Sequence, residues 1–134
     1  MASSQNTRFI MTQIFHEVFS ALRTIMEKFT PPLTVTNDNP TRYDMVSEKE
    51  VMQAGKKRNR VNFATLLIQK NYVTLYFYPV YTHPYKFKNM PGEIKKTLKG
   101  KSCFVFKELD AVLQKQVQQL MKQGFDLYKK EKRI

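Results

Sequence analysis

Two β-type segments separated by only two residues constrain this chain more than any other feature. Residues 61–69 and 72–80 are rich in strand-forming side chains, and Lys70 and Asn71 join them. So short a connection favours an antiparallel hairpin. Because side chains alternate across a strand, one face of the second segment is apolar and the other is rich in tyrosine. The residues on that second face are Tyr72, Thr74, Tyr76 and Tyr78.

Apolar residues recur at helical spacing near both ends of the chain. From Thr7 to Phe29 they form one broad stripe, and Pro31 and Pro32 end it because proline cannot donate the helical hydrogen bond. A second helical stripe begins after Asp110, which is a typical N-cap residue. The sequence therefore predicts a long N-terminal helix and a C-terminal helix.

Shorter elements fill the rest of the chain. They are, in order, a strand at 33–36, a turn at 37–40, a strand at 42–46, a solvated loop at 47–60, a loop around His83 and Pro84, a helix at 91–99 with Gly100 as its C-cap, and a strand at 102–106. This order predicts a single α+β domain over residues 1–134, with a mainly antiparallel sheet packed against the two long helices. We expect flexible tails at 1–6 and 129–134.

The size and cysteine content indicate an intracellular domain. A chain of 134 residues falls in the usual range for one core. No run approaches the roughly 20 apolar residues that span a bilayer. Cys103 is the single cysteine, so no disulfide can form within the chain. We expect a cytoplasmic protein without membrane insertion.

Positive charge is concentrated in the second half of the sequence. Residues 1–54 contain 5 Lys/Arg against 6 Asp/Glu, whereas residues 55–134 contain 18 against 5. Such asymmetry indicates an anionic partner, namely a nucleic acid, an acidic protein or a phosphorylated ligand, or else a surface that serves solubility. The tyrosine face could stack bases beside the lysines, or it could cover a half-buried sheet under a helix. The candidate binding residues are Lys56, Lys57, Arg58, Arg60, Tyr72, Tyr76, Tyr78, Lys95, Lys96, Lys99 and Lys101.

Three further motifs carry less chemistry than they first suggest. Gly100-Lys101-Ser102 looks like the end of a phosphate-binding loop, but it leads into a strand instead of opening a helix. Cys103 lies in a β-type run, where we expect a buried, unreactive thiol. His16 and His83 are too isolated for a metal site. The sequence predicts no catalytic residue, no metal ligands and no cofactor.

From about Val61 onward the chain resembles the YdhG-like, or frataxin-like, family of bacterial domains of unknown function. The residues that carry the resemblance are Lys70-Asn71-Tyr72-Val73, Pro79-Val80-Tyr81, the run Leu98 to Phe104, Gly124 and Tyr128. The resemblance implies a compact α+β fold, and its frataxin-like label implies iron delivery through surface carboxylates. The first helix offers only Glu17 and Glu27 for such a role.

These observations favour a non-enzymatic binding or adaptor module for an anionic partner. Two alternatives stay open at this point. One is a ligand-handling protein or enzyme with a pocket between sheet and helices. The other is an iron-binding or iron-delivery protein by family analogy. The broad apolar stripe of the first helix is also compatible with a homodimer.

Overall fold

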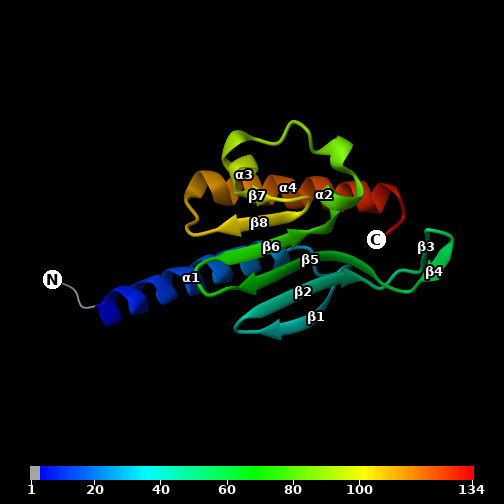
Figure 1. Cartoon of the computed structure of the whole chain (residues 1–134). Coiled ribbons are helices and arrows are strands. Elements are labelled where there is room, and N and C mark those ends of the chain that lie inside the picture. Colours follow the sequence, from blue (N-terminus) through cyan, green and yellow to red (C-terminus); the bar gives the residue numbers. More distant parts are fainter. Residues whose placement is uncertain (1–3) are drawn as a thin grey trace.

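A computed structural model describes residues 4–134 of the chain, and the side chains from Ile10 onward. Its centre is an antiparallel sheet of six strands in the order β1-β2-β5-β6-β8-β7 (Figure 1). The strands are β1 (Thr34–Asn39), β2 (Arg42–Ser47), β5 (Val61–Ile68), β6 (Val73–Phe77), β7 (Leu98–Lys99) and β8 (Cys103–Phe106). The hairpin expected over residues 61–80 is confirmed as β5 and β6, with Leu66 opposite Leu75.

The hairpin predicted around residues 37–40 is also confirmed, as β1 and β2. The side-chain oxygen of Asn39 closes its turn by accepting hydrogen bonds from the backbone N–H groups of Thr41 (3.0 Å) and Arg42 (2.9 Å). Asparagine favours turns because its short side chain can bond to nearby backbone in this way. The turn itself lies later than predicted, because Asn37, Asp38 and Asn39 extend β1 and only residues 40–41 connect the two strands.

The loop predicted over residues 47–60 is wrong in its central part. That segment contains a two-stranded hairpin, β3 (Val51–Gln53) and β4 (Lys56–Arg58), which projects beyond the end of the main sheet (Figure 1). Ala54 and Gly55, the two turn residues, both have positive φ, at 52° and 77°. Such a two-residue turn aligns its strands through backbone geometry, so it needs no apolar periodicity that the sequence could have revealed.

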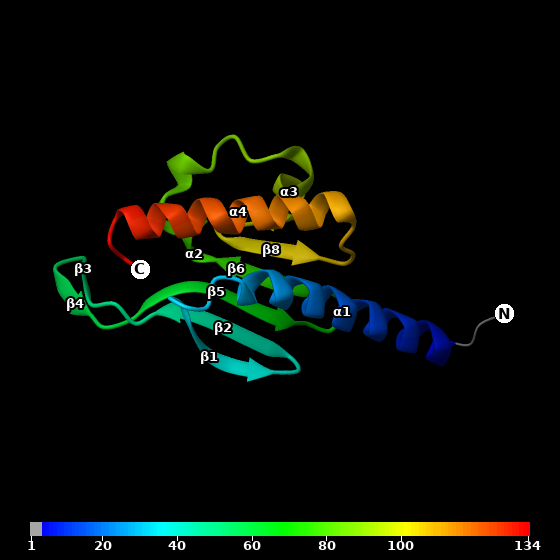
Figure 2. The same cartoon turned by 180° about the vertical axis from the view of Figure 1, so that it is seen from behind.

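Both predicted long helices are confirmed, as α1 (Ser4–Glu27) and α4 (Ala111–Lys130). They contact each other and lie on the same side of the sheet, as the two opposite views in Figures 1 and 2 show. Asp110 caps α4, because its carboxylate accepts a hydrogen bond of 2.8 Å from the backbone N–H of Leu113. Each helix extends into a segment predicted to be a flexible tail, and residues 1–3 of the first tail lie outside the described residues.

The first half of α1 extends past the edge of the sheet in both views (Figures 1 and 2). Ile10, Met11 and Ile14 are accordingly exposed there. Among residues 4–134, no helix combines the length and the apolar character needed to cross a membrane.

The core fills the space between the sheet and the two long helices, where Leu22, Phe63 and Leu75 have no exposed surface. At Gly124, α4 packs closely against Phe77 of β6. A Cβ atom at this position would lie 2.4 Å from the ring of Phe77. Glycine at 124 is therefore needed for the helix to pack against the sheet.

The segment after β6 differs from the sequence prediction. The strand expected to run to Val80 ends at Phe77, and Tyr78 begins a short helix, α2 (Tyr78–Thr82), followed by the 3₁₀ turn η1 (Pro84–Lys86). Pro79 explains the change, because proline has no N–H for the strand ladder but suits the first turn of a helix.

The predicted helix at 91–99 is present in shortened form, as α3 (Gly92–Thr97). Leu98 and Lys99 form β7 instead, paired with Phe104 and Cys103 of β8. Gly100 has a φ of +82° and lies in the turn between these two strands, so its predicted role as a helix cap is wrong. Cross-strand pairing with β8 extends the sheet at the expense of the last turn of the helix.

Candidate functional site

The face of the sheet opposite α1 and α4 is the first candidate site. Residues directly opposite one another on paired strands point to the same face. One row therefore crosses this face from Asp44 on β2 through Thr65 and Tyr76 to Cys103 on β8. The neighbouring row contains Leu67, Thr74 and Val105. We call this surface the open face, because none of the helices formed by residues 4–134 packs on it (Figure 1).

Three tyrosines lie on the open face or at its end. Tyr72, Tyr76 and Tyr78 are half-buried, so each ring keeps part of its surface in contact with solvent. The pKa of the Tyr76 hydroxyl is raised, first by the neighbouring Cys103 thiol and then by burial, with further contributions from Tyr72 and Tyr78. The three phenols are thus close enough to influence one another's charge.

Asp44 is a buried carboxylate on this otherwise cationic surface, with 9% of its side chain exposed. Its Oδ2 atom accepts hydrogen bonds from Arg42 (2.7 Å) and Asn37 (2.6 Å). Oδ1 lacks a partner of good hydrogen-bond geometry, although the Thr65 hydroxyl lies close enough to favour the charged form. Burial opposes ionisation, but the hydrogen bonds from Thr65, Arg42 and Asn37 outweigh it and lower the pKa of Asp44.

Three of the predicted cations border the open face. Lys99 lies on the edge strand opposite Cys103, and Lys101 follows in the next turn with its amino group 6.0 Å from the centre of the Tyr81 ring. Arg60 lines a small hollow together with Tyr78 and Tyr81. The structure therefore brings these cations and the tyrosines to one side of the molecule.

The other predicted cations lie elsewhere. Lys95 and Lys96 are exposed on α3, which packs against α4 on the helix-covered side of the sheet. Lys56, Lys57 and Arg58 belong to the projecting hairpin, where Lys57 forms a surface ion pair of 2.8 Å with Glu50. The eleven candidate residues therefore do not converge on one site.

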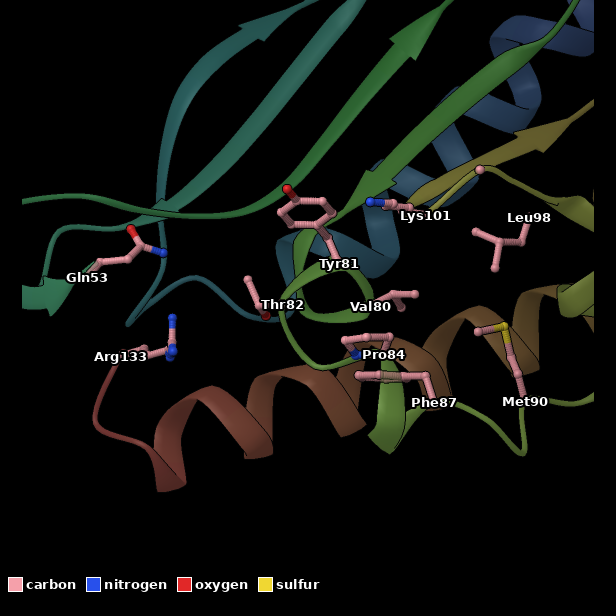
Figure 3. Close-up of a pocket in the computed structure, with 11 residues that line it drawn as sticks. Gln53, Val80, Tyr81, Thr82, Pro84, Phe87, Met90, Leu98, Lys101 and Arg133 are labelled. Atoms are coloured by element: carbon pink, nitrogen blue, oxygen red, sulfur yellow. The ribbon is translucent and has the colours of Figure 1, made fainter. Parts of the chain in front are cut away.

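A cleft of about 740 Å³ is the second candidate site (Figure 3). It lies beside α2 and is bordered by the β7–β8 turn, by β3 and by the residues after α4. Lys101 is the only one of its lining residues that the sequence predicted as a binding residue. The full lining is Gln53, Val80, Tyr81, Thr82, Pro84, Phe87, Met90, Leu98, Gly100, Lys101 and Arg133.

A chain of four hydrogen-bonding side chains adjoins the cleft through Thr82. The Thr82 hydroxyl oxygen lies 2.7 Å from the hydroxyl of Tyr128 and 2.7 Å from Nδ1 of His83. Nε2 of His83 lies 2.5 Å from a carboxylate oxygen of Glu131. Burial raises the pKa of Tyr128, and its hydrogen bond with Thr82 opposes this only in part. The adjacent Thr82 and His83 were the only sequence signal of this network, and Arg133 was assigned to a solvated tail.

Two further predictions have different outcomes, one for Cys103 and one for the Gly100-Lys101-Ser102 motif. Cys103 was predicted to be buried but is half-exposed, because it lies on the open face of β8 and not on the core face. Burial still raises the pKa of its thiol, while a hydrogen bond with Tyr76 opposes that shift. Gly100-Lys101-Ser102 forms a turn between two strands, which is not the geometry of a phosphate loop.

Neither the metal-binding side chains of the described residues nor a comparison with known proteins points to another site. Among the residues that the structure describes, no three His, Cys, Asp or Glu side chains are grouped so that they could hold a metal ion. Comparison of the chain with known protein families, curated proteins and solved structures finds no match. The resemblance to YdhG-like domains therefore stays a prediction.

Proposed function

We propose that this protein is a non-enzymatic binding module for an anionic partner, and that the partner is a single-stranded nucleic acid lying on the open face. The observation that carries the proposal is the placement of Tyr72, Tyr76 and Tyr78. Tyr76 belongs to the cross-strand row of the open face, and Tyr72 and Tyr78 are close enough to raise its pKa. Because α1 and α4 cover the opposite side of the sheet, this row does not serve as a layer beneath them. Half-exposed aromatic rings on a sheet can stack with unpaired bases, and this stacking tolerates any sequence.

Charge on the same surface suits phosphates. Lys99 and Lys101 border one edge of the open face, and Arg60 lies near Tyr78 at its end. Asp44 does not oppose an anion, because its carboxylate is almost fully covered and is paired with Arg42. A strand crossing the tyrosines would therefore meet cations at the border of the open face, and release of its condensed counterions would favour binding.

Binding of labelled oligonucleotides tests the proposal. We expect fluorescence anisotropy to show tighter binding of a 12-nucleotide single strand than of the same sequence as a duplex, at about 50 mM salt, where screening is weak. Tyr76→Ala should weaken binding by about 1–3 kcal/mol. Tyr85→Ala is the control, because Tyr85 is a tyrosine with a larger exposed fraction, 58%, and it lies on η1 outside the open face.

Two results would overturn the proposal. One is the absence of binding at low salt, which would leave the positive charge with a role in solubility. The other is equal binding of single strand and duplex with no effect of Tyr76→Ala, since that would reduce the interaction to charge alone. The predicted homodimer is a separate question, and sedimentation of the free protein would answer it.

The alternative of a ligand-handling protein is favoured by one specific observation, the cleft beside α2 (Figure 3). Its lining combines apolar side chains with Lys101 and Arg133, and it contains none of the three tyrosines of the open face. The iron-delivery alternative has no comparable support among the described residues, and titration of the protein with ferrous and ferric iron would test it directly.

A further inference from the structure

The cleft beside α2 has the size of a small-molecule site. Its volume of about 740 Å³ falls within the range of 300–1,000 Å³ typical of ligand pockets. Its walls come from segments far apart in the sequence, including Gln53 on β3, Lys101 in the β7–β8 turn and Arg133 after α4. Such a site forms only in the folded chain, which is why no local motif predicted it.

The polarity of the lining changes along the cleft. Figure 3 shows Gln53 and Arg133 at one end, with Thr82 next to them. The opposite end is apolar, and Val80 and Phe87 in its wall are almost fully buried. Met90 and Leu98 complete this end, while Lys101 lies between the two regions, beside the Tyr81 ring. A ligand that fits both ends must combine a polar or charged group with an apolar body.

The charged end is positive. Arg133 stacks on the ring of Tyr128, with its guanidinium carbon 5.4 Å from the ring centre, and its Nε lies 3.4 Å from Glu131. The carboxylate of Glu131 is shared, because it also binds His83 at 2.5 Å. No ion pair within 4.0 Å involves Lys101 among the described residues. The cleft therefore holds a cationic excess, which would attract one negative group.

The hydrogen-bond chain next to Arg133 shows why charge, and not the Thr82 hydroxyl, would select the ligand. The Thr82 hydroxyl has a partner on each side, Nδ1 of His83 and the hydroxyl of Tyr128. The backbone carbonyl oxygens of Tyr78 and Pro79 also lie within reach, at 3.3 and 3.4 Å. The hydrogen-bonding capacity of Thr82 is therefore used within the protein. Recognition of an anion falls to Arg133 and Lys101.

We propose that this cleft binds a small amphipathic carboxylate, an acid with an acyl or aryl body. The carboxylate lies at the Arg133 end, where a planar guanidinium matches its geometry, and Lys101 adds positive charge further along the cleft. The body lies between Val80, Phe87, Met90 and Leu98. This site shares Lys101 with the border of the open face, but its other lining residues are separate, and it does not depend on nucleic-acid binding.

Calorimetric titration with octanoate and with 3-phenylpropionate tests the assignment. We expect saturable binding of both acids, and much weaker binding of octanamide, which has the body without the charge, and of acetate, which has the charge without the body. Arg133→Gln should weaken octanoate binding by roughly 10-fold or more, the effect of losing a charge-assisted hydrogen bond. Lys122→Gln, which removes an exposed charge on α4 away from the cleft, is the control and should leave affinity unchanged.

A second variant protects the test against misfolding. Arg133 also packs on Tyr128, so the thermal unfolding of Arg133→Gln must match that of the wild type, and Lys101→Gln should weaken octanoate binding in the same direction. Equal affinity for octanoate and octanamide, or no binding of either acid, would overturn the proposal. Oligonucleotide binding is measured on Arg133→Gln as well. If it persists while octanoate binding fails in the wild type, the error lies in the cleft and not in the proposed function.

Discussion

The two faces of the six-stranded sheet are built from the same strands but carry different chemistry. On β6, Leu75 and Phe77 face the helices and are fully buried, whereas Tyr76 between them faces outward and is half-exposed. The covered face determines whether the chain folds, because it supplies the apolar surface that α1 and α4 bury. The open face is not needed for that core. Its aromatic and charged side chains are therefore available for a partner, which makes the comparison of the two faces testable residue by residue.

The largest expected effect is a difference in stability between variants of two neighbouring residues on β6, Phe77 and Tyr76. Phe77→Ala should lower the free energy of unfolding by about 3–5 kcal/mol, because it leaves a cavity among Phe63, Phe87 and Gly124. Tyr76→Ala should lower it by roughly 1 kcal/mol or less, since it removes only half-exposed cross-strand contacts. Urea denaturation of both variants measures the difference. Similar losses for the two would show that the open face is a second structural layer.

The next effect is a difference in the salt dependence of oligonucleotide binding between variants of two lysine pairs on opposite sides of the sheet. Replacing Lys99 and Lys101 by alanine should reduce the salt dependence of oligonucleotide binding by about one unit of log–log slope for each lost phosphate contact. The same change at Lys95 and Lys96 removes equal charge from α3, on the helix-covered side. We expect that variant to keep the wild-type slope. Equal reductions would mean that net charge acts over the whole molecule, and that the open face has no special part.

Asp44 provides a smaller effect that depends on pH. Its pKa is lower in the folded protein than in the unfolded chain. Its contribution to stability is therefore fully present above the unfolded value of about 4 and is lost as pH falls through the lower folded value. The difference in unfolding free energy between wild type and Asp44→Asn should be constant from pH 7 to about 5 and should shrink below about pH 4. Urea denaturation at several pH values measures it, and a constant difference down to about pH 2.5 would contradict this account of Asp44.

The sequence predicted the covered face better than the open face, for physical reasons. Burial imposes periodicity, so α1, α4 and the β5–β6 hairpin could be read from the spacing of apolar residues. The β3–β4 hairpin could not, because Ala54 and Gly55 define it through backbone angles alone. The start of α2 was missed because the apolar pattern continues past Phe77, although Pro79 marked the change.

The site residues show the same contrast. Tyr72 and Tyr76 were placed correctly on one face by the alternation of side chains in a strand. Strand pairing, which no local pattern reveals, decided the rest: it placed Lys99 beside the tyrosines and left Lys95 and Lys96 on the far side. The cleft depends even more on distant contacts, because Arg133 reaches it from the end of α4.

Cys103 gives the smallest expected effect and the most local report on the open face. The thiol is half-exposed, but burial raises its pKa, so less of it is thiolate near neutral pH than in an unfolded chain. We expect a disulfide reagent such as dithionitrobenzoate to label the native protein at pH 8 more slowly than the urea-unfolded protein.

A bound oligonucleotide should slow this reaction further, because Cys103 lies next to Tyr76 in the same cross-strand row. Octanoate at a saturating concentration is the control, since Cys103 does not line the cleft. Labelling that is as fast in the native as in the unfolded protein would show that the thiol is not protected by the fold. If the oligonucleotide binds but leaves the labelling rate unchanged, it lies away from Tyr76, and the open face is then not the surface that holds it.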